Sequence, residues 1–273
     1  MTRAFLTAEW RNLAMLNYVV DPALLTPFVP RGTVLDSWNG RTYVSLVGFM
    51  FVDTRVLGVP IPFHRAFEEV NLRFYVRRTV DGEVRRAVTF LRELVPRRAI
   101  ALVARLGYNE PYTALPMRHR IDVVPTGARS NQGVVPTGAC SNQGVVPTGA
   151  RSATEGPALS PALHSVEYEW QLGRKWCGLR VETTGLPRAI EHGSEEEFIT
   201  EHYWGYTRQR DGSTVEYQVV HPSWKVSAVS RATVVGDLAE LYGDALAAKL
   251  SEPPDSAFLA DGSAIAVSLP RRL

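Results

Sequence analysis

Three Asx-Gly dipeptides constrain the fold of this chain more than any other feature of its sequence. Asn39-Gly40, Asp81-Gly82 and Asp211-Gly212 each lie between two segments rich in valine, tyrosine, phenylalanine and threonine. Such a dipeptide favours a tight β-hairpin turn, because the turn residues need positive φ. Repeated hairpins without alternating strand–helix units predict an antiparallel sheet.

A few short helices accompany the predicted strands. Capping residues and flanking prolines or glycines place them at residues 21–30, 96–106, 194–202 and 237–250. A sheet of many strands needs its edges hidden, and closure achieves this. We therefore expect one α+β domain over residues 1–273, mainly an antiparallel β-sheet closed into a barrel or cone with peripheral helices.

An eleven-residue repeat interrupts this pattern. VVPTGARSNQG begins at Val123, VVPTGACSNQG begins at Val134, and an incomplete third copy begins at Val145. The period is too short for a helical solenoid, and Pro-Thr-Gly and Ser-Asn-Gln-Gly are turn and loop residues. The repeats therefore predict a flexible loop insertion over residues 122–163.

Composition excludes several classes of protein. The 30 basic and 28 acidic residues give a net charge of +2, which provides no strong field for nucleic acid or an anionic membrane. No apolar run approaches the ~18 residues that span a bilayer, and the two cysteines form neither a disulfide framework nor a zinc site. Phosphate-loop and dinucleotide fingerprints are absent from the sequence. We expect a cytoplasmic protein without a cofactor.

The hairpin around Asp81-Gly82 suggests a pair of catalytic carboxylates. A two-residue loop gives a register in which Glu68 and Glu93 are diagonal neighbours on the apolar face, about 7–8 Å apart. Two carboxylates in an apolar site cannot both ionise cheaply, which suits a general acid or base. The alternative is that both lie at strand ends and bond to backbone groups or water.

The polar face of the same hairpin gathers Glu69, Asn71 and Arg92, with Asn71 opposite Arg92 in this register. This group suits a carboxylate base beside an arginine that binds an acidic ligand. Glu69 and Arg92 also fit a plain structural ion pair, and the register itself could slip by one residue.

Three ring-bearing residues, His202, Tyr203 and Trp204, follow the predicted helix at 194–202. Glu197 and Glu201 share a face of that helix, but no second histidine is placed to complete a metal site. We therefore expect no metal. Rings with a polar tip suit the wall of a ligand pocket.

The chain contains three long and specific segments: LTAEWRNLAMLNYVVDPALLTPFVP, VLGVPIPFHRAFEEVNLRFYVR and GSEEEFITEHYWGYTRQRDGSTVEYQVVHPSWKV. They resemble the YqjF-like family of uncharacterised bacterial proteins, domain of unknown function 2071. The resemblance covers nearly the whole chain except the repeats. This family is placed beside the acetoacetate decarboxylase-like superfamily, so the resemblance implies a closed antiparallel sheet with a central cavity.

Decarboxylases of that superfamily line their cavity with an arginine near the first long strand and a glutamate after an aromatic residue. Arg11 and Glu69 occupy similar places here, and the segment comparable with the superfamily's lysine motif, Glu110–Met117, has no lysine. The only lysines of the chain are Lys175, Lys225 and Lys249. None fits the motif, so the resemblance implies a cavity without Schiff-base chemistry.

Together these observations predict a small-molecule-binding protein with a central cavity. In its catalytic form it is a lysine-independent enzyme acting on a small carboxylated or carbonyl compound. Arg11 or Arg92 would then bind the acid, and Glu69, or the Glu68/Glu93 pair, would move a proton. The alternative is a non-catalytic ligand-binding or protein-interaction barrel, which a cavity filled by phenylalanine and tryptophan would favour. We expect no nucleic-acid or membrane partner, and leave open a homo-oligomer.

Overall fold

Strands dominate the chain, which a computed structural model describes at residues 4–60, 66–96, 111–124 and 163–273. The strands are β1 (Leu6–Val20), β2 (Val34–Leu35), β3 (Thr42–Val56), β4 (Val59–Pro60), β5 (Phe67–Val80), β6 (Glu83–Val95), β7 (Tyr112–Ala114), β8 (Met117–Val124), β9 (Leu163–Leu172), β10 (Lys175–Ala189), β11 (Trp204–Arg208), β12 (Thr214–Val220), β13 (Lys225–Val235), β14 (Ser256–Val267) and β15 (Arg271–Arg272). The helices are α1 (Pro22–Leu25), the 3-10 helix η1 (Thr26–Phe28), α3 (Glu195–Thr200), α4 (Ala239–Tyr242) and α5 (Asp244–Leu250). The helix predicted at 96–106 and the repeat insertion lie, apart from their end residues, outside the described residues.

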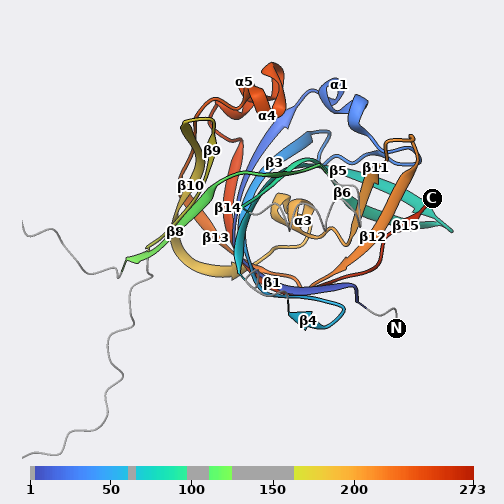
Figure 1. Cartoon of the computed structure of the whole chain (residues 1–273), viewed down its shortest axis with the longest axis horizontal. Helices are drawn as coiled ribbons and strands as arrows, with labels where there is room; N and C mark the ends of the chain where they lie inside the picture. Colours follow the sequence, from blue (N-terminus) through green and yellow to red (C-terminus); the bar gives the residue numbers. More distant parts are fainter. Residues whose placement is uncertain (1–3, 61–65, 97–110, 125–162) are drawn as a thin grey trace, which may run out of the picture.

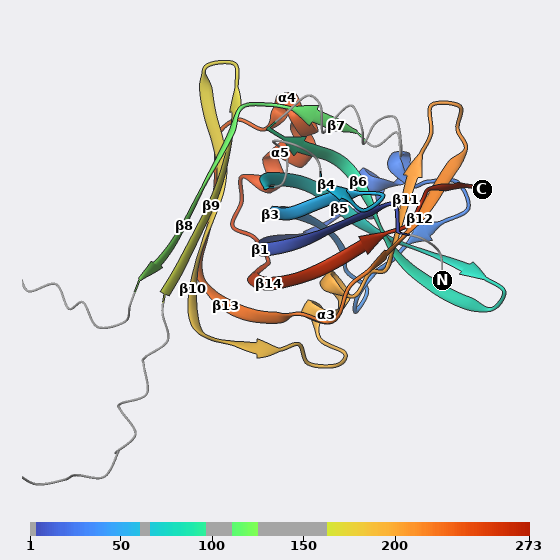
Figure 2. The same cartoon turned by 60° about the horizontal axis from the view of Figure 1, so that its bottom comes forward.

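Hydrogen-bonded neighbours arrange seven of these fifteen strands in a ring. β1 pairs with β14 and β3, β3 with β5, and β5 with β6. β11 then joins β6 to β12, and β12 pairs back to β14. Figure 1 looks into this ring, and Figure 2 shows it after a 60° turn. β13, β10, β9 and β8 continue from β14 as an outer layer.

Two of the predicted hairpin turns have two residues, but of these only Asp81-Gly82 joins two paired strands. The segment before Asn39 forms β2, which pairs with β5, so the first predicted hairpin is limited to a bridge between Trp38 and Arg41. Asn39 and Asp81 have φ of 49° and 52°, and each is followed by a glycine with positive φ. Val80 pairs with Glu83 across the second turn, as predicted. The third hairpin, β11–β12, has a longer turn that includes Gly212, with φ of 80°. The mainly antiparallel sheet with few helices is therefore confirmed.

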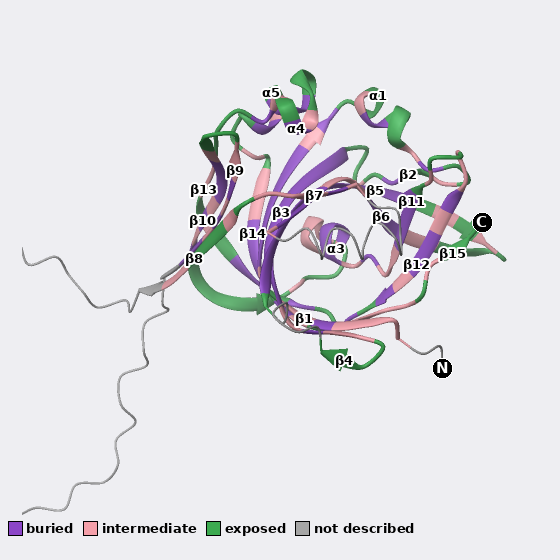
Figure 3. Ribbon diagram, in the orientation of Figure 1, coloured by how far each residue is buried: buried purple, intermediate pink, exposed green. Residues whose placement is uncertain are grey.

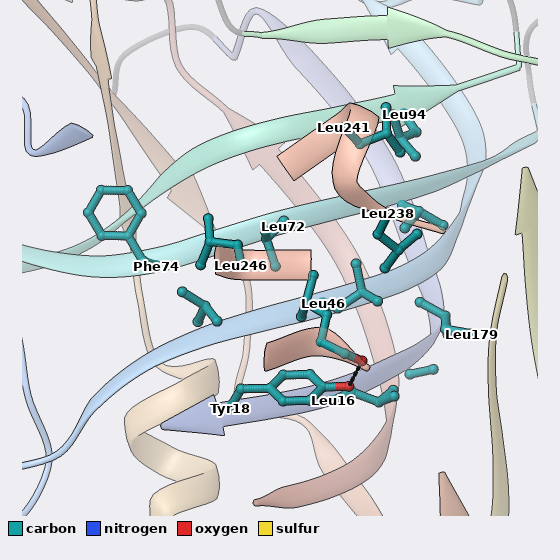
Figure 4. Close-up of a cluster of buried hydrophobic side chains, with 14 of the residues drawn as sticks. Leu16, Tyr18, Leu46, Leu72, Phe74, Leu94, Leu179, Leu238, Leu241 and Leu246 are labelled. Carbon is teal, nitrogen blue, oxygen red and sulfur yellow. Dashed lines mark hydrogen bonds between the residues drawn. The ribbon is translucent and has the colours of Figure 1, made fainter. Parts of the chain in front are cut away.

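The outer face of the ring carries a leucine-rich core. Leu16, Leu46 and Leu72 come from three neighbouring strands and pack against Leu179 of β10 and the helices α4 and α5. Figure 4 shows this cluster, in which the Tyr18 hydroxyl donates to the carbonyl of Leu250 at 3.4 Å. Figure 3 shows β3 buried along most of its length, because this layer covers one face and the ring interior covers the other.

Two helix predictions need correction. The single helix predicted at 237–250 is divided into α4 and α5 at Gly243, whose φ of 75° cannot continue a right-handed helix. α3 is not peripheral, since it lies within the outline of the ring in Figure 1. Its Phe198 and Ile199 are buried among the inward-facing side chains of the ring strands. We use the term inner wall for the inward-facing surface of the ring strands, which contacts Phe198 and Ile199.

Candidate functional site

A β-bulge alters the hairpin that carries the predicted carboxylates. Strands β5 and β6 keep the predicted register from the turn as far as Arg73, which pairs with Phe90. The next residue of β5, Leu72, pairs with Arg92, so Leu91 is an extra residue in β6. Because successive side chains of a strand point to opposite faces, the bulge reverses the face of every later residue in β6 relative to the prediction.

The bulge overturns both predicted constellations. Asn71 lies opposite Glu93, not Arg92. Glu93 therefore shares a face with Glu69 and is not a diagonal neighbour of Glu68. The predicted Glu68/Glu93 pair is wrong, and Arg92 does not belong to the group formed by Glu69 and Asn71. A pair of diagonal carboxylates nevertheless exists, and its members are Glu69 and Glu93.

One row of side chains crosses the inner wall at this level. Its successive backbone partners on β1, β3, β5, β6 and β7 are Met15, Val47, Asn71, Glu93 and Tyr112. Glu69 and Arg73 flank this row along β5, each two residues from Asn71 and hence about 7 Å away along the strand. We call the five paired residues the inner-wall row, and Glu69 and Arg73 its two flanking residues.

Two hydrogen bonds fix the Glu69 side chain beside the inner-wall row. The Asn71 amide Nδ2 donates to Glu69 Oε1 at 3.1 Å, and the Tyr112 hydroxyl donates to Glu69 Oε2 at 3.3 Å. Glu69, Asn71 and Glu93 are only 3%, 2% and 1% exposed. Burial and a neighbouring like charge both disfavour two ionised carboxylates. The arrangement therefore brings two carboxyl groups and an amide together in a buried part of the inner wall.

The three ring-bearing residues at 202–204 point to different places. The His202 ring lies 4.7 Å from the Tyr75 ring, both in the interior. Burial, followed by the charges of Arg86 and Arg73, holds the pKa of His202 well below its usual value, so the ring is neutral. Tyr203 donates to the Glu201 carboxylate. Trp204 packs against the outer core. Only His202 joins the inner wall.

Three other predicted site residues lie away from the inner-wall row. Arg11 is half-exposed and forms an ion pair with Glu9 at 2.7 Å. Arg92 donates its Nε to the Leu241 carbonyl at 3.2 Å, on the outer face. Glu68 also lies on the outer face, with Oε2 3.5 Å from Nδ1 of His119.

Sequence reasoning missed two residues of the site. Arg73 belongs to the same alternating face of β5 as Glu69 and Asn71, so extending that face by one step would have found it. Tyr112 lies in the segment compared with the superfamily's lysine motif, and it places a hydroxyl on Glu69. The three lysines lie elsewhere. Lys175 and Lys225 are exposed at strand starts, and Lys249 forms ion pairs with two acidic side chains.

Beyond the row, the interior is aromatic. Phe51 and Phe67 stack with their ring centroids 4.8 Å apart, and Trp10 meets Trp224 edge-on at 6.2 Å. At α3, a pocket of about 210 Å³ is lined by residues that include Asp36, Trp38, Arg86 and Phe198. Phe198 lies between this pocket and the interior, since its ring centroid is 5.7 Å from that of His202. The interior thus combines a polar level with apolar surroundings.

The described ranges contain neither a cluster of metal ligands nor a membrane-spanning helix. No three histidine, cysteine, aspartate or glutamate side chains gather there in a way that could hold a metal ion. Among the same residues, no helix is both long enough and apolar enough to cross a membrane.

The architecture is that of the acetoacetate decarboxylase-like fold. Acetoacetate decarboxylase from Legionella pneumophila superposes with a TM-score of 0.57 at 9% identity, covering 98% of this chain and 86% of that one. The enduracididine biosynthesis enzyme MppR, in complex with the condensation product of pyruvate and imidazole 4-carboxaldehyde, gives 0.57 at 11% identity over 100% and 90%. An acetoacetate decarboxylase-like enzyme from Sphingomonas wittichii RW1 gives 0.53 at 12% over 100% and 94%. Identities this low show the fold alone.

Sequence similarity is more specific. The chain belongs to the family of uncharacterized conserved proteins DUF2071, which matches residues 7–264. The uncharacterized protein YqjF of Bacillus subtilis (strain 168) is 33% identical over 110 residues, which cover 40% of this chain and 44% of that protein. The match thus spans less than half the length of this relative. The resemblance inferred from the sequence is confirmed.

Proposed function

We propose that this chain is a small-molecule-binding protein whose ligand site is the interior of the strand ring, closed as a barrel or cone. The supporting observation is that buried Glu69, Asn71 and Glu93 converge at one level of the inner wall. Burying polar groups is unfavourable, so their convergence in an apolar interior indicates a functional role. The fold neighbour MppR was solved with a small organic product bound, which supports a ligand in a fold of this kind.

In the catalytic form of this proposal, Glu69 and Glu93 move a proton on a small carboxylated or carbonyl compound. One carboxyl group holds the proton while the other is ionised, because their proximity and burial push their affinities for the proton apart. No Schiff base takes part, since none of the three lysines lies on the inner wall. Borohydride with acetoacetate should therefore leave no covalent label, and a stable adduct on any lysine would overturn this point.

The second candidate is a non-catalytic ligand-binding or protein-interaction barrel. It is favoured by the aromatic packing of Phe51, Phe67, Trp10 and Trp224, which fills part of the interior. The two candidates differ in what Glu69 and Glu93 do. Only catalysis requires a titrating carboxyl group, whereas a binding site requires a hydrogen-bonding group of the same shape.

Native mass spectrometry of the freshly purified full chain tests the site. We expect a retained small molecule in the parent protein, and its loss from Glu69→Gln and Glu93→Gln. Glu68→Gln is the matched control, because Glu68 adjoins Glu69 but lies on the outer face. Equal retention by all three variants, or no bound molecule at all, would refute the interior as the ligand site.

Thermal melts separate a functional carboxyl group from a structural one. If Glu69 and Glu93 are kept for proton transfer, their glutamine variants should be as stable as the parent near neutral pH. If they are ionised structural partners, each variant should lose more than about 1 kcal/mol, the scale of a charge-assisted hydrogen bond.

A further inference from the structure

Some of the buried polar atoms without a hydrogen-bond partner lie on the inner wall. In the described part of the chain they include Oδ1 of Asn71 and Nε of Arg73. Buried polar groups are normally hydrogen-bonded, so each exception needs an explanation. Atoms of this kind that face one interior are best explained by a ligand that bonds to them.

Among these groups, Arg73 is the most costly to bury, because it carries a charge. It is 8% exposed, and its Nε has no hydrogen-bond partner among the residues that the structure describes. Its Nη2 donates to the Ile199 carbonyl at 3.2 Å and lies 4.0 Å from the Met15 sulfur. Met15 belongs to the inner-wall row, so the guanidinium leans toward the level of Asn71. A buried guanidinium with an unsatisfied N–H is strongly unfavourable, and an anionic ligand group would relieve it.

Asn71 needs a ligand group of the opposite kind, namely a hydrogen-bond donor. Its Nδ2 donates to the Glu69 carboxylate at 3.1 Å, and this bond assigns the orientation of the amide. Oδ1 is then an acceptor that needs a donor. No donor of the described residues reaches it, so a hydroxyl or amino group of a ligand can supply this bond.

We infer that the inner wall between Asn71 and Arg73 binds a small carboxylate that also carries a hydrogen-bond donor, such as a short hydroxy acid or amino acid. The carboxylate accepts from the Arg73 guanidinium, and the hydroxyl or amino group donates to Asn71 Oδ1. The two side chains start about 7 Å apart along β5, which suits a ligand of three or four carbons. This inference rests on the proposed function and deepens it by naming the ligand class.

The same geometry predicts which acids bind poorly. A keto acid presents an acceptor to Asn71 Oδ1, where a donor is needed. A dicarboxylate brings a second negative charge toward Glu69 and Glu93, which oppose it. The relative affinities for acids of equal size therefore test the placement of the Asn71 acceptor and the Arg73 donor directly.

Calorimetric titration of the full chain tests the inference with four probes: 3-hydroxybutanoate, 4-aminobutanoate, acetoacetate and succinate. We expect one of the first two to bind at least about 10-fold more tightly than acetoacetate and succinate, the scale of one charged-group hydrogen bond. Asn71→Leu should remove the preference over acetoacetate. Arg73→Gln should weaken binding of the preferred acid by at least about 10-fold. Arg92→Gln is the matched control and should bind as the parent does, because Arg92 lies on the outer face.

Arg73→Lys covers the case in which Arg73→Gln does not fold, because it keeps the charge and removes the planar fork. It should melt near the parent and bind the preferred acid more weakly. The inference is overturned if Arg73→Lys binds as the parent does, if succinate or acetoacetate binds as tightly as the hydroxy and amino acids, or if none of the four binds. If the parent still retains a native ligand that Glu69→Gln loses, the proposed function survives such a result and only the ligand class fails.

Discussion

Glu93 lies directly opposite Asn71 across strands β5 and β6, because Leu91 bulges out of β6 one step earlier. If Leu91 paired within the ladder instead, Arg92 would take this place, and a guanidinium would replace a carboxylate at the centre of the inner-wall row. One extra residue in a strand thus decides the charge of the candidate site. It also sends Arg92 to the outer face, where it bonds to the Leu241 carbonyl near α4.

Deleting Leu91 should remove the bulge and leave the rest of the ladder in place. Leu91 is the extra residue of β6, so the pairs Leu72–Arg92 and Asn71–Glu93 are retained, and Arg92 and Glu93 keep their present faces. We expect the deletion to cost about as much as Leu91→Ala, which should lose less than about 2 kcal/mol in the free energy of unfolding for a partly buried leucine. Denaturant unfolding of both variants checks this. A loss of more than about 3 kcal/mol for the deletion alone, the scale of an uncompensated buried charge, would show that the inner-wall row cannot form without the bulge.

His202 should make the protein less stable in mild acid. Burial, Arg86 and Arg73 lower its pKa in the folded state well below 6.5. The unfolded chain takes up a proton as the pH falls below about 6.5, while the folded protein does not. The stability is therefore complete above that pH and declines below it, by at most about 1.4 kcal/mol per pH unit.

Denaturant unfolding at pH 7.5 and 5.5 measures this effect. The parent should lose about 1 kcal/mol more than His202→Gln between the two pH values. His192→Gln should retain the parent's loss, because the side chain of His192 is 98% exposed. A similar acid-induced loss in His202→Gln and the parent would contradict a neutral, buried His202.

Gly48 should be irreplaceable where the ring meets its outer layer. A Cβ at this position would lie 2.5 Å from Cδ2 of the Tyr168 ring, which is fully buried. The ring cannot easily move, because its hydroxyl donates to the Asn12 carbonyl at 2.9 Å. We expect Gly48→Ala to cost about 1–3 kcal/mol by overpacking. In a Tyr168→Ala background the same change should cost much less, and an additive double mutant would rule out this contact as the cause.

Shortening the repeat insertion should leave the fold intact. β8 and β9 are direct antiparallel partners up to Val124 and Leu163, so the two ends of the insertion are already adjacent. Deleting residues 134–155 removes two repeat copies and should change the free energy of unfolding by less than about 1 kcal/mol, since loop-closure entropy varies only slowly with length. Thermal melts of the deletion variant check this. A loss of several degrees or more would mean that the repeats contribute to packing.

The local features of this protein could be predicted from short stretches of its sequence. Asn39-Gly40 and Asp81-Gly82 form two-residue turns, because positive φ at adjacent positions is a property of those residues alone. Ser194 caps α3, and its hydroxyl oxygen accepts from the backbone N–H of Glu197 at 3.2 Å, as the predicted capping motif requires. The alternation of β5 also correctly grouped Glu69 with Asn71. Each of these signals is contained in a few neighbouring residues.

Which residues face the interior together depends on long-range packing and could not be predicted from the sequence. The bulge at Leu91, the place of α3 within the ring and the outward packing of Trp204 depend on contacts between segments far apart in the chain. A strand pattern has period two, so it reports that side chains alternate without stating which face is covered by which layer. Here β9, β10, α4 and α5 cover one face and α3 covers the other. That packing turns Glu93 toward Glu69 and Arg92 away from it.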